Sequence, residues 1–258
     1  MVRPRRLNSL LCLTLWLVAI DGHAASVLFE QGHGQRFVIE RTGELDLSQL
    51  AGLFEQQAMT VVSSDQPLDQ LRLDQHAMIV ISGAFAPFGI DERRALLRYV
   101  EQGGRLVVLL HVGPLNGALL ADFGVAVSNG VVFDPERATG APTSDFRVDR
   151  LATHPLLQGV EQLKVYGAWA LNPVADAESL LNASATAWMD LNRNRRQDSA
   201  EPVAPFSLAV IGRRGRGEYI VLGDDAIFQN RYLHAGNRQL AQNLVQWGRS
   251  APVGGASR

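Results

Sequence analysis

Residues 77–111 read AMIVISGAFAPFGIDERRALLRYVEQGGRLVVLLH, and this stretch decides the fold class. Two of its runs, 77–82 and 105–110, are continuously apolar over the length of a strand, as strands covered on both faces are. Between them, Asp91 is placed to cap a helix that carries apolar residues at helical spacing and ends at the glycine pair 103–104. A strand, a helix and a second strand in this order predict two parallel strands joined by a right-handed crossover.

The same alternation of strand and helix continues on both sides of this unit. Toward the N-terminus, Val27–Phe29 and 60–63 are short strand-like runs. The segment between them carries leucines at helical spacing after Asp46, which we expect to cap that helix. Toward the C-terminus, 115–123 has the apolar spacing of a further helix. We therefore predict an α/β fold with an open parallel sheet and helices on both of its faces.

The pattern changes at Val125, where short strand-like segments joined by Gly, Pro and Asn turns replace the helices. These segments are Val125–Val127, Val131–Phe133, Phe146–Val148, Leu163–Leu171 and Ser179–Leu181. They predict a β-rich C-terminal elaboration over about 125–215, which a hairpin of 206–211 and 218–222 connects back to the sheet. With a last helix near the C-terminus, we predict one domain over 26–250 and a disordered tail at 251–258.

The first 25 residues have the three-part organisation of a secretory signal peptide. A basic start is followed by the apolar run 10–20, which is too short to span a bilayer as a helix, and then by small residues. We expect cleavage near Ala24 or Ala25 and a periplasmic or secreted mature protein. A buried N-terminal helix or a retained anchor is the alternative. Cys12, the only cysteine, lies in the predicted signal peptide, so the mature protein would have no thiol for disulfides, metal sites or nucleophilic catalysis.

Several classes of function find no support in the composition or motifs. The formal net charge of −2 and the scattered arginines argue against nucleic acid as a partner. No phosphate-binding loop occurs, so we expect no nucleotide cofactor, and neither a Gly-x-Ser-x-Gly elbow nor a His-Glu-x-x-His helix is present. No second apolar segment is long enough to cross a membrane, which predicts a mature chain without a transmembrane segment.

Polar side chains follow four of the predicted strands at their carboxyl ends, where open parallel sheets bind ligands. If those strands are parallel neighbours, the side chains meet in one cleft. The residues that we predict to bind a ligand there are Glu30, His33, Gln35, Ser82, Phe85, His111, Asn116, Asp225 and Asn230. His33, His111 and Asp224 are the candidates for catalysis, because imidazole titrates near neutral pH and a nearby carboxylate can orient it.

Two other roles are open for these histidines and carboxylates. They carry the donor atoms of a metal site. They also fit a structural role, in which His33 caps a loop, His111 bonds a neighbouring carbonyl, and Asp224 and Asp225 begin a helix or a turn. Trp169 is predicted to pack in the core or at the rim of the cleft, where an indole ring can stack on a sugar.

Three segments resemble a known group of domains. They are VLFEQGHGQRF at 27–37, RYVEQGGRLVVLLH at 98–111, and GDDAIFQN with GNRQLAQNLVQW between 223 and 247. These segments are similar to class I glutamine amidotransferase-like domains. The closest subset is the uncharacterised bacterial domain family number 4350, with the GldG-type gliding-motility transporter domain and its intraflagellar-transport counterpart as relatives. The resemblance implies a flavodoxin-like sheet.

The resemblance also bears on catalysis. Catalytic amidotransferases carry a nucleophilic cysteine at the turn after the strand that corresponds to 105–110, and this turn here reads His111-Val112-Gly113. The resemblance therefore implies a binding or scaffold role in place of glutamine hydrolysis. A histidine at this turn, with His154-Pro155-Leu156 downstream, also resembles the ThuA-like carbohydrate-utilisation branch.

Residues 190–201, DLNRNRRQDSAE, have the ligand spacing of a twelve-residue calcium-binding loop. The predicted ligands, at positions one, three, five, seven, nine and twelve, are Asp190, Asn192, Asn194, Arg196 through its carbonyl, Asp198 and Glu201. Position six, normally glycine, is Arg195, and the loop's arginines bring positive charge to the site. The flanking segments look like strands, so this is no helix-flanked EF-hand. A solvated Asn/Asp turn is the alternative to calcium.

These observations lead to three hypotheses about function. The first is an exported, non-catalytic amidotransferase-like domain that binds a small polar ligand or an envelope protein beside a calcium-stabilised loop. The second is a ThuA-like hydrolase or isomerase that acts on a carbohydrate or an envelope substrate. The third is a structural subunit of an envelope complex, which an exposed apolar patch would distinguish from the other two.

Overall fold

The structure is a computed structural model that describes residues 25–251. The predicted signal peptide, apart from Ala25, and residues 252–258 of the predicted tail lie outside these residues. Ala251, the first residue of that tail, is buried against the rest of the chain.

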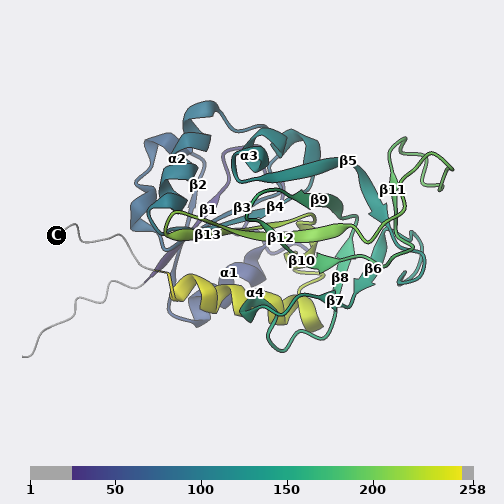
Figure 1. Ribbon diagram of the computed structural model, residues 1–258. Helices are drawn as coiled ribbons and strands as arrows, with labels where there is room; N and C mark the ends of the chain where they lie inside the picture. The colour runs from purple at the N-terminus through teal and green to yellow at the C-terminus, as the bar shows by residue number, and fades with distance from the viewer. Residues whose placement is uncertain (1–24, 252–258) are drawn as a thin grey trace, which may run out of the picture.

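Five parallel strands form one half of the main sheet (Figure 1). They are β1 (Ser26–Glu30), β2 (Thr60–Ser64), β3 (Met78–Ser82), β4 (Arg105–Leu109) and β13 (Gly217–Leu222). Their spatial order is β2-β1-β3-β4-β13, in which all neighbours are parallel. Taken in sequence, this is the order 2-1-3-4-5 of a flavodoxin-like sheet. The predicted fold class is therefore confirmed.

Helices cover both faces of this sheet (Figure 1). On one face, α1 (Ser48–Gln56) and α4 (Ala235–Arg249) share a buried core with β1. On the other face, α2 (Ile90–Glu101) and α3 (Gly117–Asp122) pack on side chains of β3 and β4. Five short 3₁₀ helices lie in the connections: η1 (Leu68–Gln70), η2 (Leu73–Gln75), η3 (Gly113–Asn116), η4 (Pro155–Leu157) and η5 (Ala226–Phe228).

Neither predicted helix cap has the expected role. Asp46 precedes α1 but bonds the loop before it, accepting the N–H of Val38 at 3.3 Å and that of Gly43 at 3.1 Å. At α2, the cap is formed by Glu92, whose Oε2 accepts the N–H of Gly89 at 2.9 Å. The side chain of Asp91 takes no part in this cap.

Antiparallel strands extend the sheet beyond β13, where the sequence predicted the β-rich elaboration. They are β5 (Val125–Phe133), β7 (Arg150–Leu151), β9 (Trp169–Pro173), β10 (Glu178–Asn182), β11 (Trp188–Asp190) and β12 (Ser207–Arg214). A separate two-stranded sheet contains β6 (Asp145–Val148) and β8 (Leu163–Tyr166). The two segments predicted at 125–127 and 131–133 are one strand, β5, with an irregular register between them. The single segment predicted at 163–171 is two strands, because the chain turns at Gly167, where φ is +89°.

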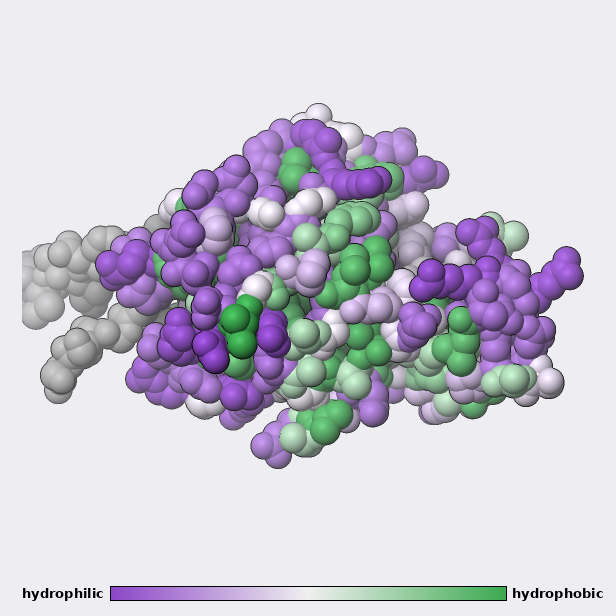
Figure 2. Space-filling view, turned by 90° about the horizontal axis from the view of Figure 1, so that it is seen from above, coloured by the Kyte–Doolittle hydropathy of each residue, from purple (hydrophilic) through white to green (hydrophobic). Residues whose placement is uncertain are grey.

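Figure 2 shows the molecule from above, the side on which Figure 1 places α2 and α3. Apolar residues form a band across the middle of this face, between hydrophilic regions. This side of the molecule is therefore of mixed polarity. Of the helices within residues 25–251, none combines the length and the apolar character that a membrane crossing requires.

Candidate functional site

The carboxyl ends of β1, β3, β4 and β13 lie next to one another, because these four strands are consecutive neighbours in the sheet. The four loops that carry the predicted site residues therefore start from one edge. The side chains divide into two groups, one around His33 and one around His111.

His33 is buried between two carboxylates. Its Nδ1 lies 2.7 Å from Oε1 of Glu30 and its Nε2 lies 3.2 Å from Oε2 of Glu92, and its ring stacks on Phe88 with centroids 3.8 Å apart. Burial lowers the pKa of His33, but the hydrogen bonds and charges of Glu30 and Glu92 outweigh it and leave the pKa above its ordinary value. This raised pKa favours the imidazolium form, in which both ring nitrogens donate to carboxylates.

The remaining partners of Glu30 and Glu92 tie three segments together. Glu30 also accepts the N–H of Gly32 at 2.6 Å and the amide of Gln35 at 2.5 Å, and Glu92 accepts the N–H of Leu68 at 3.1 Å. The cluster thus joins the loop after β1 to η1 and to the start of α2. Because its ring nitrogens are both occupied, His33 orders this loop and offers no ring atom to a ligand.

His111 has a different environment. Its Nδ1 lies 3.0 Å and 3.2 Å from the two carboxylate oxygens of Asp225, while no hydrogen bond to its Nε2 occurs within residues 25–251. The His111 side chain is 37% exposed and that of Asp225 only 3%. Phe85 and Phe37 lie on the ring, with centroids 4.8 Å and 5.4 Å away. His111 is therefore anchored at one nitrogen and accessible at the other.

Backbone contacts fix both members of this pair. The N–H of Asp225 donates to the carbonyl of Leu110 at 3.0 Å, and Nε1 of Trp169 donates to the carbonyl of His111 at 3.0 Å. Gly83, with φ of +63°, leaves room for the carboxylate, since a Cβ there would lie 2.5 Å from Oδ2 of Asp225. Asp225 can approach His111 only because this position is glycine.

Charge in the site follows from these contacts. The hydrogen bond to Asp225 raises the pKa of His111 above its ordinary value, against a lowering by burial. Burial, together with the charge of Asp225, raises the pKa of Asp224 to about 7. Asp224 is enclosed, and its oxygens accept the N–H of Tyr166 at 2.6 Å and of Ala226 at 2.9 Å. It therefore supports the loop after β13 and lies out of reach of a ligand.

The other predicted ligand-binding residues have mainly internal contacts. Ser82 is buried at the end of β3, and Nδ2 of Asn116 donates to the carbonyl of Ala84 at 3.4 Å. Asn230 bonds the N–H of Gln49 and the carbonyl of Gly43, at 2.9 Å and 2.8 Å, and so fixes the start of α1. Of the predicted set, His111 and Phe85 form the accessible part of the site, and the buried Asp225 holds His111 in place.

Two further residues belong to this site that the sequence interpretation did not select. Phe37 lies on the ring of His111, and the guanidinium of Arg36 lies 5.0 Å from the ring centroid of Phe85. Both belong to the segment 27–37 that carries the family resemblance. Their position directly after Gln35, in the loop that follows β1, was the available signal.

The polar side chains of the 190–201 loop bond one another and the backbone of the same loop. Asp190 accepts the N–H groups of Asn194 and Arg195 at 3.2 Å and 3.0 Å, and the amides of Asn192 and Asn194 donate to Oδ2 of Asp198 at 2.5 Å and 2.9 Å. Arg195 adopts the left-handed conformation usual for glycine at position six, with φ of +60°. Glu201 closes the loop by accepting the N–H of Leu191 at 2.9 Å.

Within residues 25–251, no three His, Cys, Asp or Glu side chains are grouped so that they alone could hold a metal ion. The carboxylates of the 190–201 loop do not form such a group. A cation there would depend on the amide oxygens of Asn192 and Asn194 and on the carbonyl of Arg196 as well.

Solved structures show the same fold. The mmIFT52 N-terminal domain is 17% identical to this chain with a TM-score of 0.70, and the match covers 91% of this chain and 100% of that domain. A ThuA-like protein from Parabacteroides merdae is 12% identical with a TM-score of 0.55, covering 88% of this chain and 90% of its own. A cytoplasmic protein from Salmonella typhimurium is 13% identical with a TM-score of 0.53, and the match covers 86% of this chain and 98% of that protein.

Comparison with curated proteins gives no significant match. A family model does match, described as "Domain of unknown function (DUF4350)", and it covers residues 42–245. This range begins before α1 and ends within α4, so it includes the strands from β2 to β13 and the loop that carries His111, while β1 and His33 lie before it. The chain belongs to the DUF4350 family.

Proposed function

We propose that this chain is a non-catalytic binding domain, amidotransferase-like in its ancestry, that takes a small neutral saccharide through His111 at the carboxyl edge of the sheet. The observation that carries the proposal is the half-exposed imidazole, held by Asp225 through Nδ1 and open at Nε2. One anchored nitrogen orients the ring, and the other can exchange hydrogen bonds with a hydroxyl group.

The surroundings of His111 favour a saccharide. A sugar ring presents an apolar C–H face together with hydroxyl groups, so it stacks on aromatic rings while it forms hydrogen bonds. Phe37 and Phe85 provide such rings beside the imidazole of His111, and Arg36 adds a donor over Phe85. The site therefore combines apolar surface and hydrogen-bonding groups in the way that a sugar requires.

The roles of His33 and Asp224 favour binding over catalysis. Acid–base catalysis needs two groups within hydrogen-bond reach of one substrate position. His33 uses both ring nitrogens on Glu30 and Glu92, and Asp224 uses both oxygens on backbone N–H groups. In the class of domains that the sequence resembles, the nucleophile is a cysteine at the turn where this chain has His111.

The proposal includes export and calcium. The basic start and apolar run of residues 1–25 support secretion to the periplasm or beyond. The spacing of the oxygen-bearing side chains from Asp190 to Glu201, and the left-handed Arg195 at position six, support calcium as the ion that orders the 190–201 loop.

The test is an NMR titration of the histidine ring resonances with lactose and maltose. The wild-type protein is expected to show saturating shifts of the His111 resonances. His111→Gln, whose binding is followed on the sugar resonances, should bind about tenfold more weakly through loss of the hydrogen bonds. The exposed His234, at the start of α4, supplies the control variant His234→Gln, which should bind as the wild type does. Equal affinities for wild type and His111→Gln would reject the proposal.

The same spectra test the second hypothesis, a hydrolase or isomerase. Its supporting observation is the His111–Asp225 pair, the arrangement that orients a general base. Cleavage of lactose to its monosaccharides, or conversion of its reducing sugar to a ketose, would appear as new sugar resonances. Such products, absent with His111→Gln, would replace the binding role by catalysis.

A further inference from the structure

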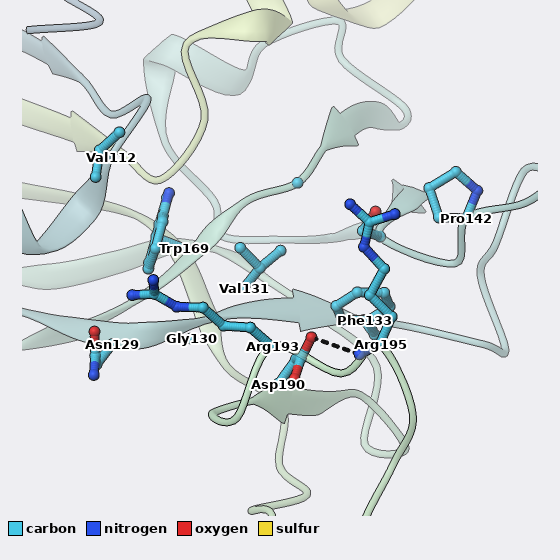
Figure 3. A pocket seen from close by; sticks show the side chains of 12 residues that line it. Val112, Asn129, Gly130, Val131, Phe133, Pro142, Trp169, Asp190, Arg193 and Arg195 are labelled. Atoms are coloured by element: carbon cyan, nitrogen blue, oxygen red, sulfur yellow. Dashed lines mark hydrogen bonds between the residues drawn. The ribbon is translucent and has the colours of Figure 1, made fainter. Parts of the chain in front are cut away.

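A cavity of about 460 Å³ lies beside β5 (Figure 3). Trp169, which bonds the carbonyl of His111, lines it, but the side chains of His111 and Asp225 do not. Its walls come from the turn after β4, from β5, β9 and the end of β11 with the loop that follows, and from the segments that precede β6 and β9. The lining residues are Val112, Asn129, Gly130, Val131, Phe133, Pro142, Ser144, Gly167, Trp169, Asp190, Arg193 and Arg195. The volume lies in the range of small-molecule sites.

The cavity has an apolar wall and a cationic rim. Trp169, Val131 and Phe133 form the wall, and Figure 3 shows Arg193 directed toward Trp169 and Arg195 toward Pro142. The only carboxylate in the lining is Asp190, and its two oxygens accept backbone N–H groups of its own loop. A ligand in the cavity therefore meets two guanidinium groups and little opposing negative charge.

Arg193 and Arg195 differ from the arginines that pair with acidic residues elsewhere in the fold. Arg93 pairs with Asp122, Arg214 with Glu101 and Arg105 with Glu218. Among residues 25–251, neither Arg193 nor Arg195 has a carboxylate within ion-pair distance. Their charge at the rim is thus uncompensated by the protein.

The backbone holds these two side chains at the rim in an unfavourable conformation. Arg193 and Arg195 have φ of +64° and +60°, in the left-handed region that residues with a Cβ adopt at a cost. Asp190 holds this turn by accepting the N–H of Arg195 at 3.0 Å. Non-glycine residues in strained turns concentrate at ligand sites, where the surrounding structure maintains them.

We infer that this cavity binds a small organic anion, with a carboxylate or phosphate group on Arg193 and Arg195 and an apolar ring against Trp169 and Val131. Guanidinium groups bind these anions through paired hydrogen bonds, which are stronger than bonds between neutral groups. Asn129 and Ser144 add polar groups to the same walls. The inference is independent of saccharide binding at His111.

The experiment is isothermal calorimetry of the full chain with phenyl phosphate, benzoate, inorganic phosphate and phenol in a phosphate-free buffer of low ionic strength. Phenyl phosphate and benzoate unite the two features of the cavity, and inorganic phosphate and phenol each supply one. We expect the two aromatic anions to bind at least about tenfold more tightly than either fragment. Arg193→Gln and Arg195→Gln should each weaken their binding about tenfold.

Matched variants separate this cavity from other causes. Arg196→Gln removes the same charge from the same loop outside the lining and should bind as the wild type does, and so should His111→Gln. Val131→Phe fills the apolar side and should weaken phenyl phosphate more than inorganic phosphate. Absence of binding by both aromatic anions at millimolar concentration would overturn the inference. Equal weakening by Arg196→Gln, which would indicate a nonspecific charge effect, would overturn it too.

Discussion

Asp225 is almost fully enclosed, while the imidazole that it bonds is more than a third exposed. This difference places the charge that governs His111 out of solvent, where it is poorly screened. The ionisation of His111 is therefore the property most sensitive to Asp225, and it can be measured without knowing the ligand.

Asp225→Asn is expected to lower the pKa of His111. The substitution removes the charged hydrogen bond that raises the pKa and leaves burial, which lowers it. NMR titration of the ring resonances measures this directly. His154, whose pKa burial lowers and which does not contact Asp225, is the internal control and should titrate unchanged. An unaltered His111 titration would show that Asp225 is not its charge partner.

The same pKa sets the sign of a stability effect. Because the folded pKa of His111 lies above the unfolded value, the protonated ring stabilises the fold. That contribution is complete below the ordinary pKa of 6.5 and is lost as the pH rises through the folded value. The difference in unfolding free energy between wild type and His111→Gln should shrink across this window.

Asp224→Asn is expected to cost stability at low pH and less at neutral pH. The folded pKa of Asp224, about 7, lies above the ordinary 3.8, so the wild type loses stability as the pH rises between these values, by about 1.4 kcal/mol per pKa unit. Asn cannot ionise, but it leaves one buried N–H without its acceptor, which costs about 1–3 kcal/mol at every pH. Urea denaturation at several pH values measures the difference in unfolding free energy between wild type and Asp224→Asn. A difference that does not change with pH would contradict this account.

From the sequence, only those site residues could be predicted whose position is determined by the carboxyl end of a strand. His111 and Asp225 follow apolar runs that any parallel sheet brings to one edge, so their proximity was predictable. The hydrogen bond between His33 and Glu92, which occupies the second ring nitrogen of His33, was not predictable. Glu92 is 59 residues away, and the contact depends on how α2 packs. The same holds for Asn230, whose partners lie at the start of α1, 181 residues away.

Among the elements, the 190–201 loop carries the clearest prediction. Calcium should raise the melting temperature of the wild type and leave that of the Asp190→Ala, Glu201→Ala variant unchanged, since the variant lacks the first and last ligands. At about 100 times Kd, the stabilisation would be about 2.7 kcal/mol. Melting with calcium or with chelator measures the shift.

The control variant Asp176→Ala, Glu161→Ala removes two exposed carboxylates elsewhere and should retain the calcium-dependent shift. A shift that persists without Asp190 and Glu201 would assign calcium to another place.

The central elements of the parallel half were predictable because β3 and β4 are continuous apolar runs between turn residues. Residues 77–82 and 105–110 differ from β3 and β4 by one residue each. In the antiparallel half, the local signals were ambiguous. Ser128-Asn129-Gly130 has the composition of a turn, but Oγ of Ser128 accepts the N–H of Ala170 at 3.1 Å and keeps the chain in the sheet as one strand.

The whole molecule is expected to unfold in one transition, because one buried cluster crosses both halves of the sheet. It joins Val27, Phe54 and Val107 of the parallel half to Leu181 and Leu208 of the antiparallel half. Urea unfolding followed by circular dichroism and by tryptophan fluorescence should give the same midpoint. Trp169 and Trp188, both in the antiparallel half, make a separate transition of that half visible, and such a transition would contradict this expectation.

A core substitution tests the same cooperativity. Leu106→Ala in β4 should lower the unfolding free energy by about 2–5 kcal/mol and shift both signals together, since its side chain is 0% exposed. Leu115→Ala, at a position that is 39% exposed, is the control and should change the unfolding free energy by about 0.5 kcal/mol or less.

The described chain begins and ends at the edge of the sheet opposite the one that carries His111. Ser26 begins β1, and Ser250, just past α4, accepts a hydrogen bond at 3.4 Å from Arg105, the first residue of β4. Both therefore lie at the amino edge of the sheet, and His111 at the carboxyl edge. Attachment of the protein to a sensor surface through either end would orient the carboxyl edge toward the solution, so immobilisation by an affinity tag at either end leaves that edge free for binding measurements.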